Sequence, residues 1–445
     1  MLFRSRSLLR LALQEYRVFL SQPWDMRVLI VTNLVYGLTM PVIESFIGFY
    51  VMLTSNDPKM VVAYQLAVYT GIPLTFLVNG WLLRVVGIKR LYSVGMLLSG
   101  VAMIALMSLG ELDVQGLCVV GVLMGMSFGL YWANRDFLAL ASTNDSNRNY
   151  YYGLENFFLM NTAVGVPLVV GTFIAQFGGE DLVLVNQAYQ IVTVVVFALA
   201  LVASVICHQG RFPNPPPTQF LFFRYHWLWN RMQVLAVFKG IGQIFLVTMP
   251  AMLGMTFVGK EGALGPLQSV AALLAAVLLY VLGRVTGPKH RIYLFALGYS
   301  LFALGTAANA VLFDMYGALL FLLLLALGRP LIEFSYFPIQ MLVIDTVSAI
   351  ENRNKYAYIF NQEFGFFLGR AAGCGLFFLL AYSWDVAVAL RYALLLGVLQ
   401  VLSIPVAVTI LRGCARHTPP DGPSAEQLVD RPEALVPAAP DQLER

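Results

Sequence analysis

Charged residues are scarce in this chain of 445 residues: Asp, Glu, Lys and Arg make up 12%, against 59% for hydrophobic residues. A water-soluble fold needs a much larger polar surface, so that class is excluded. The mean hydropathy of +0.74 indicates lipid as the solvent for most side chains. At about 20 residues per crossing plus short loops, the length accommodates about twelve transmembrane helices.

Cysteine and histidine are also scarce, with four of each. The cysteines do not lie at disulfide or zinc-site spacing, so we expect neither. No glycine-rich Lys-Ser/Thr loop, Asp-rich motif or His cluster for catalysis is found, so we expect no cofactor, no metal and no enzymatic activity. The net charge of +4 is too small for nucleic-acid binding.

The apolar runs are too long for barrel strands and predict an all-α polytopic membrane protein. The expected spans are 27–53, 60–83, 91–109, 115–142, 153–177, 184–207, 232–257, 263–284, 291–312, 317–343, 356–382 and 387–411.

The loops alternate in charge along the whole chain. Basic residues gather in loops on one side, as at Arg84, Lys89 and Arg90, whereas the other loops are short and mostly acidic, as at Asp57 and Asp113. Because basic loops stay in the cytoplasm, both termini are expected there. Short loops without an external glycosylation site favour a bacterial inner (plasma) membrane.

A proline-rich connection divides the chain into two halves. The sequence predicts a cytoplasmic amphipathic segment at 1–26, a six-helix bundle at 27–207, a cytoplasmic linker at 208–231, a second six-helix bundle at 232–412 and a disordered cytoplasmic tail at 413–445.

The two halves repeat short motifs in the same order. The loop at 84–90, RVVGIKR, corresponds to 284–290, RVTGPKH, and the loop at 147–151, NRNYY, corresponds to 352–356, NRNKY. Two such matches indicate a duplicated six-helix unit with pseudo-symmetry.

The stretch at 80–90, GWLLRVVGIKR, resembles the signature loop of the major facilitator superfamily, approximately G-x-L-a-D-r-x-G-r-k-r. The resemblance implies two six-helix bundles that rock around a central site. Arg84 stands where the family has an aspartate, so the cytoplasmic latch of the family must differ here. By this resemblance the cytoplasmic gate comprises Arg84, Gly87, Lys89, Arg90, Arg284, Gly287 and Lys289.

About nine ionisable residues fall inside the expected spans, where each costs at least a few kcal/mol at the bilayer centre. The resemblance implies that the first, fourth, seventh and tenth helices line the cavity, and all four carry charge. These intramembrane residues are Glu44, Arg135, Asp136, Glu155, Lys239, Arg329, Glu333, Glu363 and Arg370.

Spacing gives these charges provisional roles. Arg329 and Glu333 lie four apart on one helical face, so they are expected either to pair or to clamp substrate together with Lys239 and Gln243. Glu44 has no basic neighbour on its own helix and is a candidate proton carrier, unless a basic residue across the cavity fixes it.

The remaining charges lie nearer the helix ends. Arg135 and Asp136 are adjacent and expected to face different directions, with Asp136 a second coupling candidate. Glu155 and Glu363 are expected near helix starts, where the helix dipole favours a carboxylate.

Two aromatic pairs occupy corresponding places in the halves. Tyr131-Trp132 and Tyr336-Phe337 precede the two Asn-Arg-Asn loops by equal counts. We expect them to line the cavity and to stack on an apolar part of the substrate, although interfacial aromatic belts are the alternative explanation.

The sequence thus favours a monomeric secondary transporter that moves a small solute with a proton or another coupling ion. The alternative is a lipid or lipid-linked-glycan flippase on the same fold. The nearly balanced cavity charges select no substrate class.

Overall fold

The computed structural model describes residues 16–109, 112–143, 148–179, 182–212, 214, 221–258, 273–274, 290–353 and 355–417. Every regular element within these ranges is a helix. In this described part of the chain, ten helices are long and apolar enough to cross a membrane, or eleven if one bent pair counts as a span. The expected eighth span, 263–284, lies outside the described residues apart from 273–274. The all-α membrane fold is therefore confirmed.

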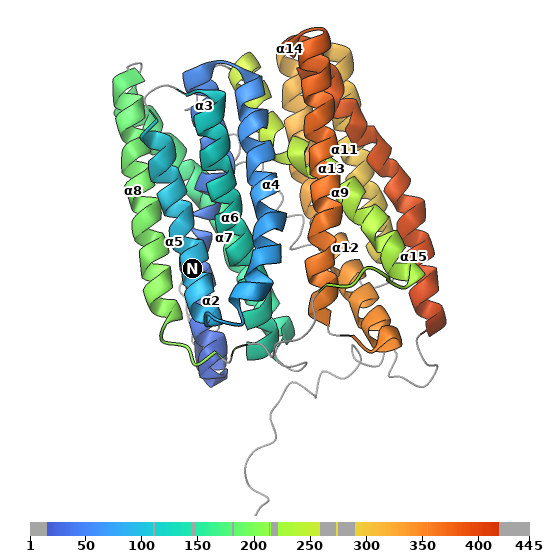
Figure 1. Cartoon of the computed structure of the whole chain (residues 1–445). Helices are drawn as coiled ribbons and strands as arrows, with labels where there is room; N and C mark the ends of the chain where they lie inside the picture. Colours follow the sequence, from blue (N-terminus) through green and yellow to red (C-terminus); the bar gives the residue numbers. More distant parts are fainter. Residues whose placement is uncertain are drawn as a thin grey trace, which may run out of the picture.

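The helices form two bundles that stand side by side (Figure 1). The first contains α2 (Trp24–Gly37), η1 (Val42–Phe46), α3 (Ile47–Ser55), α4 (Pro58–Leu82), α5 (Ile88–Met107), α6 (Val114–Ser142), α7 (Arg148–Gly178) and α8 (Leu182–Cys207). The second contains α9 (Trp227–Leu253), η2 (Gly254–Val258), α11 (Arg291–Leu312), α12 (Met315–Glu351), α13 (Lys355–Ser383), α14 (Val386–Tyr392), η4 (Ala393–Leu402) and α15 (Ser403–His417).

The acidic loop residues act as helix caps at one end of the molecule. Asp57, Asp113, Asp314 and Asp385 precede α4, α6, α12 and α14, and each side chain accepts a hydrogen bond from a backbone N–H of the first helical turn. Such caps satisfy amide groups that a helix start leaves without an internal partner. We call this end the acidic end, and the opposite end, with the loop of Arg84 to Arg90, the basic end.

Glycines bring the central helices of each bundle into close contact. On α6, Gly121 and Gly125 face α4, where a Cβ on Gly125 would overlap the Val68 carbonyl oxygen. On α13, a Cβ on Gly369 would overlap the carbonyl oxygen of Val237 on α9. Small residues allow this approach because association inside lipid depends on close packing. Both bundles therefore contain helix pairs that pack backbone against backbone.

The apolar cores show how the bundles meet. One large cluster joins residues of both bundles near the acidic end, including Tyr50 and Tyr64 of the first and Met249 and Leu390 of the second. Near the basic end each bundle has its own cluster, around Tyr92 in the first and around Trp229, Tyr336 and Val347 in the second. The bundles therefore share a core that lies mostly near the acidic end but extends toward the basic end through the contact between Phe76 of α4 and Phe360 of α13, while each bundle also has its own core at the basic end.

The first span departs from the continuous helix expected at 27–53. After α2 ends at Gly37, Pro41 precedes the π-helical turn η1, and the two parts meet at an angle of 40°. A proline removes a backbone donor and crowds the preceding turn, which accounts for a break at this point. The break matters because Glu44 lies within η1.

Candidate functional site

Glu44 forms an ion pair between the two bundles. Its Oε2 lies 3.6 Å from Nη2 of Arg329 on α12. The side chains are 41% and 48% exposed, and because charged groups are very costly against lipid, we infer that this exposed surface is hydrated. The sequence left open whether Glu44 pairs with a basic residue across the cavity, and Arg329 is such a partner. A long, hydrated pair of this kind contributes only about 0–1 kcal/mol, so it opens easily.

A second ion pair lies one helical turn further along α12. Lys239 on α9 donates from Nζ to Oε2 of Glu333 at 2.7 Å. The lysine is almost fully buried, and its ammonium lies 4.1 Å from the ring centroid of Tyr336 and 4.2 Å from that of Phe337. A buried cation in lipid requires such compensation from a carboxylate and from aromatic faces.

The expected pairing of Arg329 with Glu333 within one helix is wrong. The spacing of four does place both on one face, but the partners are Glu44 for Arg329 and Lys239 for Glu333. Both partners lie on other elements, Glu44 on η1 and Lys239 on α9. Packing of the helices thus gives Arg329 and Glu333 each an opposite charge from outside α12. We call Glu44, Lys239, Arg329, Glu333 and Phe337 the inter-bundle site.

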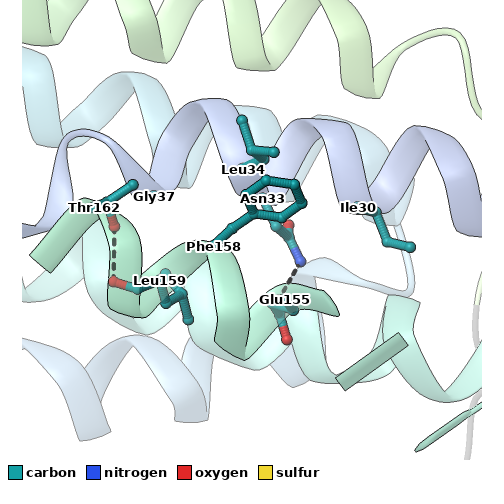
Figure 2. A pocket seen from close by; sticks show the side chains of 8 residues that line it. All are labelled: Ile30, Asn33, Leu34, Gly37, Glu155, Phe158, Leu159 and Thr162. Atoms are coloured by element: carbon teal, nitrogen blue, oxygen red, sulfur yellow. Dashed lines mark hydrogen bonds between the residues drawn. The ribbon is translucent and has the colours of Figure 1, made fainter. Parts of the chain in front are cut away.

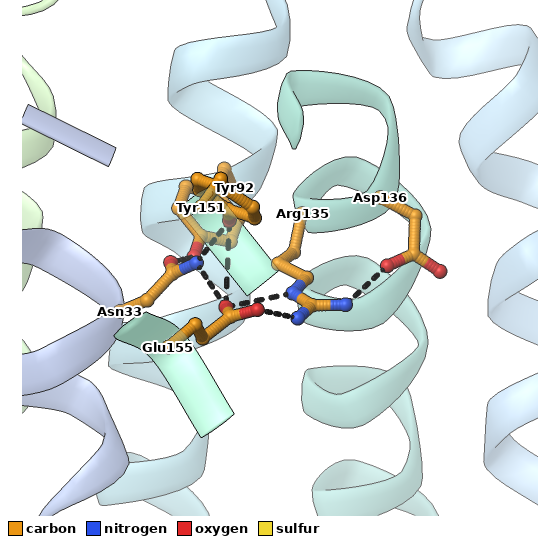
Figure 3. Close-up of polar contacts among 6 residues, drawn as sticks. All are labelled: Asn33, Tyr92, Arg135, Asp136, Tyr151 and Glu155. Atoms are coloured by element: carbon orange, nitrogen blue, oxygen red, sulfur yellow. Dashed lines mark hydrogen bonds and ion pairs between the residues drawn. The ribbon is translucent and has the colours of Figure 1, made fainter. Parts of the chain in front are cut away.

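A third group of polar residues is buried inside the first bundle (Figure 3). Glu155 on α7 accepts bonds from Asn33 Nδ2 at 2.7 Å and Arg135 Nε at 3.1 Å, and it forms an ion pair with Arg135 Nη2. Tyr92 donates to Asn33 Oδ1. Glu155 is therefore bound in a buried network and does not serve only as a charge near a helix start.

Asp136 extends this network toward solvent. Its Oδ1 lies 2.7 Å from Arg135 Nη1, and 29% of its side chain is exposed. Arg135 and Asp136 leave α6 in different directions, yet the long Arg135 side chain reaches both Glu155 and Asp136. Figure 3 shows Asp136 on the side of Arg135 away from Glu155. One guanidinium thus bridges a buried carboxylate and a partly exposed one.

A small pocket adjoins the same network between α2 and α7 (Figure 2). Its floor contains Asn33 and Glu155, and apolar side chains such as Leu34 and Phe158 surround them. The space of about 10 Å³ suffices for one water molecule at most. This pocket is therefore too small to hold a transported solute.

Arg370 forms a further junction between the bundles. It donates to Gln243 Oε1 at 2.9 and 2.7 Å and lies 3.3 Å from Glu363 Oε2. Its guanidinium carbon lies 4.7 Å from the ring centroid of Tyr69, which belongs to α4 of the first bundle. Gln243, expected to contact substrate, is thus engaged by Arg370 and lies beside the inter-bundle site. The same pairing gives Glu363, expected near a helix start, a specific partner.

A family model described as the Major Facilitator Superfamily matches residues 26–374. This chain belongs to the Major Facilitator Superfamily. That assignment agrees with the helical fold and with charged residues at the interface of two bundles. As a member of this family, the chain is a multi-pass membrane protein of a transporter family.

Two curated proteins are similar in sequence. The chain is 23% identical over 371 residues to uncharacterized protein YqgE of Bacillus subtilis (strain 168), an alignment that covers 81% of this chain and 84% of that protein. It is 26% identical over 192 residues to an uncharacterized protein in the sodM 3'region of Geobacillus stearothermophilus, covering 43% and 86%.

Solved transporter structures share the fold of this superfamily member. A bacterial homologue of the iron transporter ferroportin, in an inward-facing state, matches with a TM-score of 0.62 at 15% identity, over 89% of this chain and 100% of that one. A peptide transporter matches with a TM-score of 0.61 at 14% identity, over 89% and 96%. At these identities the likeness concerns the fold alone.

The two aromatic pairs of this transporter divide into buried and accessible members. Tyr131 and Tyr336 are buried, and Tyr131 packs 4.5 Å from the ring of Tyr36. Trp132 is half-buried, whereas Phe337 is 47% exposed on the same face of α12 as Arg329 and Glu333. Tyr131 and Tyr336 are therefore enclosed by the helices, whereas Phe337 is accessible at the surface of α12.

The signature loop of the transporter contacts the start of the linker. Lys89 donates from Nζ to the Gly210 carbonyl oxygen at 2.8 Å, and Asn214 Oδ1 accepts from the Ile88 amide at 3.0 Å. Arg84 and Arg90 are exposed, and Gly87 adjoins Asn214. The matching gate residues of the second half, Arg284, Gly287 and Lys289, lie outside the described residues.

Sequence reasoning missed Asn33 and Tyr92 of the buried network, and also Tyr69 beside Arg370. It also missed Tyr151, whose hydroxyl accepts from Asn33 Nδ2 at 2.9 Å and donates to Glu155 Oε1. Asn33 offered one signal, because an amide within an apolar span needs a partner. The tyrosines resemble ordinary membrane aromatics in the sequence, and only the packing of the helices reveals their roles.

Proposed function

We propose that this transporter moves a small charged solute by exposing the inter-bundle site alternately to the two sides of the membrane. The observation that carries the proposal is the Glu44–Arg329 contact, at 3.6 Å with both side chains half-exposed. Because the contact joins the bundles and is weak, charged groups of a solute can replace either partner. Sites at the interface of two related bundles suit rigid-body rocking.

The arrangement of the cores supports a state that is open toward the basic end. Most of the shared core lies toward the acidic end, whereas toward the basic end each bundle also has its own core and the two bundles still meet through Phe76 and Phe360. Rocking about the inter-bundle site would reverse this arrangement. Because basic loops are expected to face the cytoplasm, we propose that this state gives access from the cytoplasm, with both termini on that side.

We further propose that protons drive transport through Glu44 and Asp136. Each carboxylate is partly exposed and pairs with an arginine, Glu44 with Arg329 and Asp136 with Arg135. Protonation removes the charge that holds the arginine, which links proton binding to a change in the contact between helices. The relatives from two bacilli support a place in the bacterial plasma membrane. One chain supplies the whole site, so a monomer suffices.

The test begins with a ligand screen on the purified full-length protein. The panel contains sugars, amino acids, nucleosides, drugs and lipids, together with peptides and iron chelates, because structurally similar proteins include a proton-dependent oligopeptide transporter and a homologue of the iron transporter ferroportin. A ligand of the folded state raises the melting temperature. The variants are Arg329→Ala combined with Glu333→Ala, and Lys59→Ala as a control at the acidic end.

The proposal expects a solute that stabilises the wild type and Lys59→Ala but not the double variant. The same solute should accumulate in proteoliposomes when a pH gradient is imposed, and Glu44→Gln should abolish that response. A solute bound equally well by the double variant would refute the placement of the site. Stabilisation by lipids alone would instead favour the flippase alternative.

A further inference from the structure

The ammonium of Lys239 is enclosed on several sides by groups that bind organic cations. Its Nζ lies 4.1 Å from the ring centroid of Tyr336, 4.2 Å from that of Phe337 and 5.9 Å from that of Phe366. Glu333 Oε2 accepts its hydrogen bond at 2.7 Å. We call Glu333, Tyr336, Phe337 and Phe366 the ammonium cage.

These four groups have the chemistry of an ammonium receptor. Aromatic faces within about 6 Å of a cation attract it through their negative π surfaces, and a carboxylate completes the charge balance. Sites for quaternary ammonium ligands use the same combination of rings. In this chain the occupant is the end of a lysine side chain, whose charged part is chemically a primary alkylammonium ion.

The cage is accessible from the inter-bundle site. Glu333 is 35% exposed and Phe337 is 47% exposed, whereas Tyr336 and Lys239 are buried beneath them. Arg329 lies one turn away on the same face of α12 and reaches Glu44 of the other bundle. A cation that arrives between the bundles therefore meets the carboxylate and one ring of the cage first.

We propose that the ammonium cage is the substrate subsite of this transporter, that Lys239 fills it in the absence of solute, and that the solute is an organic ammonium compound. The inference rests on the proposed function, because it names the substrate class of the same inter-bundle site. Lys239 acts as a tethered competitor that keeps the cage closed until a free ammonium group displaces it.

Charge balance gives the exchange its stoichiometry. The cage holds one carboxylate and one positive charge. When an organic cation binds Glu333, the Lys239 ammonium becomes an unpaired charge in a nearly dry environment unless it loses its proton. It therefore releases one proton to bulk water and becomes a neutral amine, so one proton leaves for each cation bound.

The surrounding charges favour that release. Besides Glu333, the charged groups that act on Lys239 are Arg329 on α12 and Arg370 on α13, both positive, and Glu363 on α13. Arg370 already pairs with Glu363, and Arg329 pairs with Glu44. Glu363 is therefore already engaged by a buried guanidinium, and the two arginines repel a displaced lysine ammonium.

The experiment measures binding of tetramethylammonium chloride to full-length protein in detergent, with sodium chloride at equal ionic strength as the reference. Isothermal titration gives the affinity between pH 6.5 and 8.5, and a pH-sensitive dye in weakly buffered solution counts released protons. The variants are Lys239→Met, which empties the cage, and Phe337→Leu, which removes its exposed ring. Lys59→Met is the matched control, because its ammonium lies 5.2 Å from the ring of Tyr382 outside the site.

The wild type and Lys59→Met should release about one proton per cation, and their affinity should rise about 10-fold per pH unit, as linkage requires for one exchanged proton. Lys239→Met should bind more tightly at neutral pH, with no proton release and no pH dependence. Phe337→Leu should bind roughly 2- to 30-fold more weakly, which is the affinity equivalent of one cation–π contact.

Three results would overturn the inference: binding by the wild type without proton release, Lys239→Met binding no better than the wild type, or no binding by any variant. None of them would affect the proposed function, because alternating access is tested by side-specific labelling that needs no ammonium ligand. Conversely, a protein labelled from one side only would refute alternating access even if it bound tetramethylammonium.

Discussion

Two ion pairs of similar composition should respond very differently to the loss of a carboxylate. Arg135–Glu155 lies inside the first bundle, with side chains 13% and 4% exposed. Glu44–Arg329 joins the bundles, with side chains 41% and 48% exposed. The substitutions Glu155→Gln and Glu44→Gln each remove one charge with almost no change in shape.

The expected loss in the free energy of unfolding depends on how deeply each ion pair is buried. Removing one partner of a buried pair costs about 3–5 kcal/mol, because the other charge stays in a low-dielectric environment. Asp136 continues to face Arg135, so we expect the lower end, about 3 kcal/mol, for Glu155→Gln. A hydrated pair contributes about 0.2–1 kcal/mol, which is the expected loss for Glu44→Gln.

The measurement is thermal unfolding of both variants in one detergent, followed by intrinsic fluorescence. At about 2–4 °C per kcal/mol for a unit the size of one bundle, Glu155→Gln should melt roughly 6–12 °C below the wild type. Glu44→Gln should melt at most about 4 °C below it while losing the response of transport to a pH gradient. Equal losses, or a larger loss for Glu44→Gln, would refute the division into a structural pair and a functional one.

Two further substitutions test packing and capping. Gly369→Ala places a methyl group against the α9 backbone and should destabilise by about 1–3 kcal/mol or more, whereas Gly375→Ala on the same helix has open space and should change the melting temperature little. His226 caps α9, and burial, together with nearby His417, lowers its pKa. The folded state therefore favours the neutral His226 ring. The stability that this neutral ring contributes above about pH 6.5 is lost as the pH falls below that value. His226→Asn keeps a capping acceptor and should reduce the change in melting temperature between pH 7.5 and 5.5. If the variant's melting temperature changed with pH as much as that of the wild type, His226 would be excluded as the source of this pH dependence.

The sequence predicted the spans well because lipid imposes one simple rule. A run of about 20 apolar residues must become a helix, since no other single segment satisfies its backbone in hydrocarbon. The expected span 291–312 coincides with α11. The departures occur where a local feature overrides this rule, as at Pro41 before η1 and in the ten residues of η4, which adopt a 3-10 helix inside the last span.

The ion-pair partners could not be predicted from spacing. Periodicity shows which residues of one helix share a face, and it correctly placed Arg329 and Glu333 together. It contains no information on which other helix packs there, and the actual partners, Glu44 and Lys239, lie far away in the sequence. The same limit applies to Asn33 and its tyrosine partners, whose shared network depends on the packing of several helices.

The most direct test of the account is side-specific labelling of Phe337→Cys. The four native cysteines, Cys118, Cys207, Cys374 and Cys414, are first replaced by alanine. A membrane-impermeant thiol reagent is then applied to right-side-out and to inside-out vesicles. Alternating access predicts labelling from both sides, at rates that a bound solute changes in opposite directions. Labelling from one side only, with or without solute, would contradict the claim that the inter-bundle site opens alternately to the two sides of the membrane.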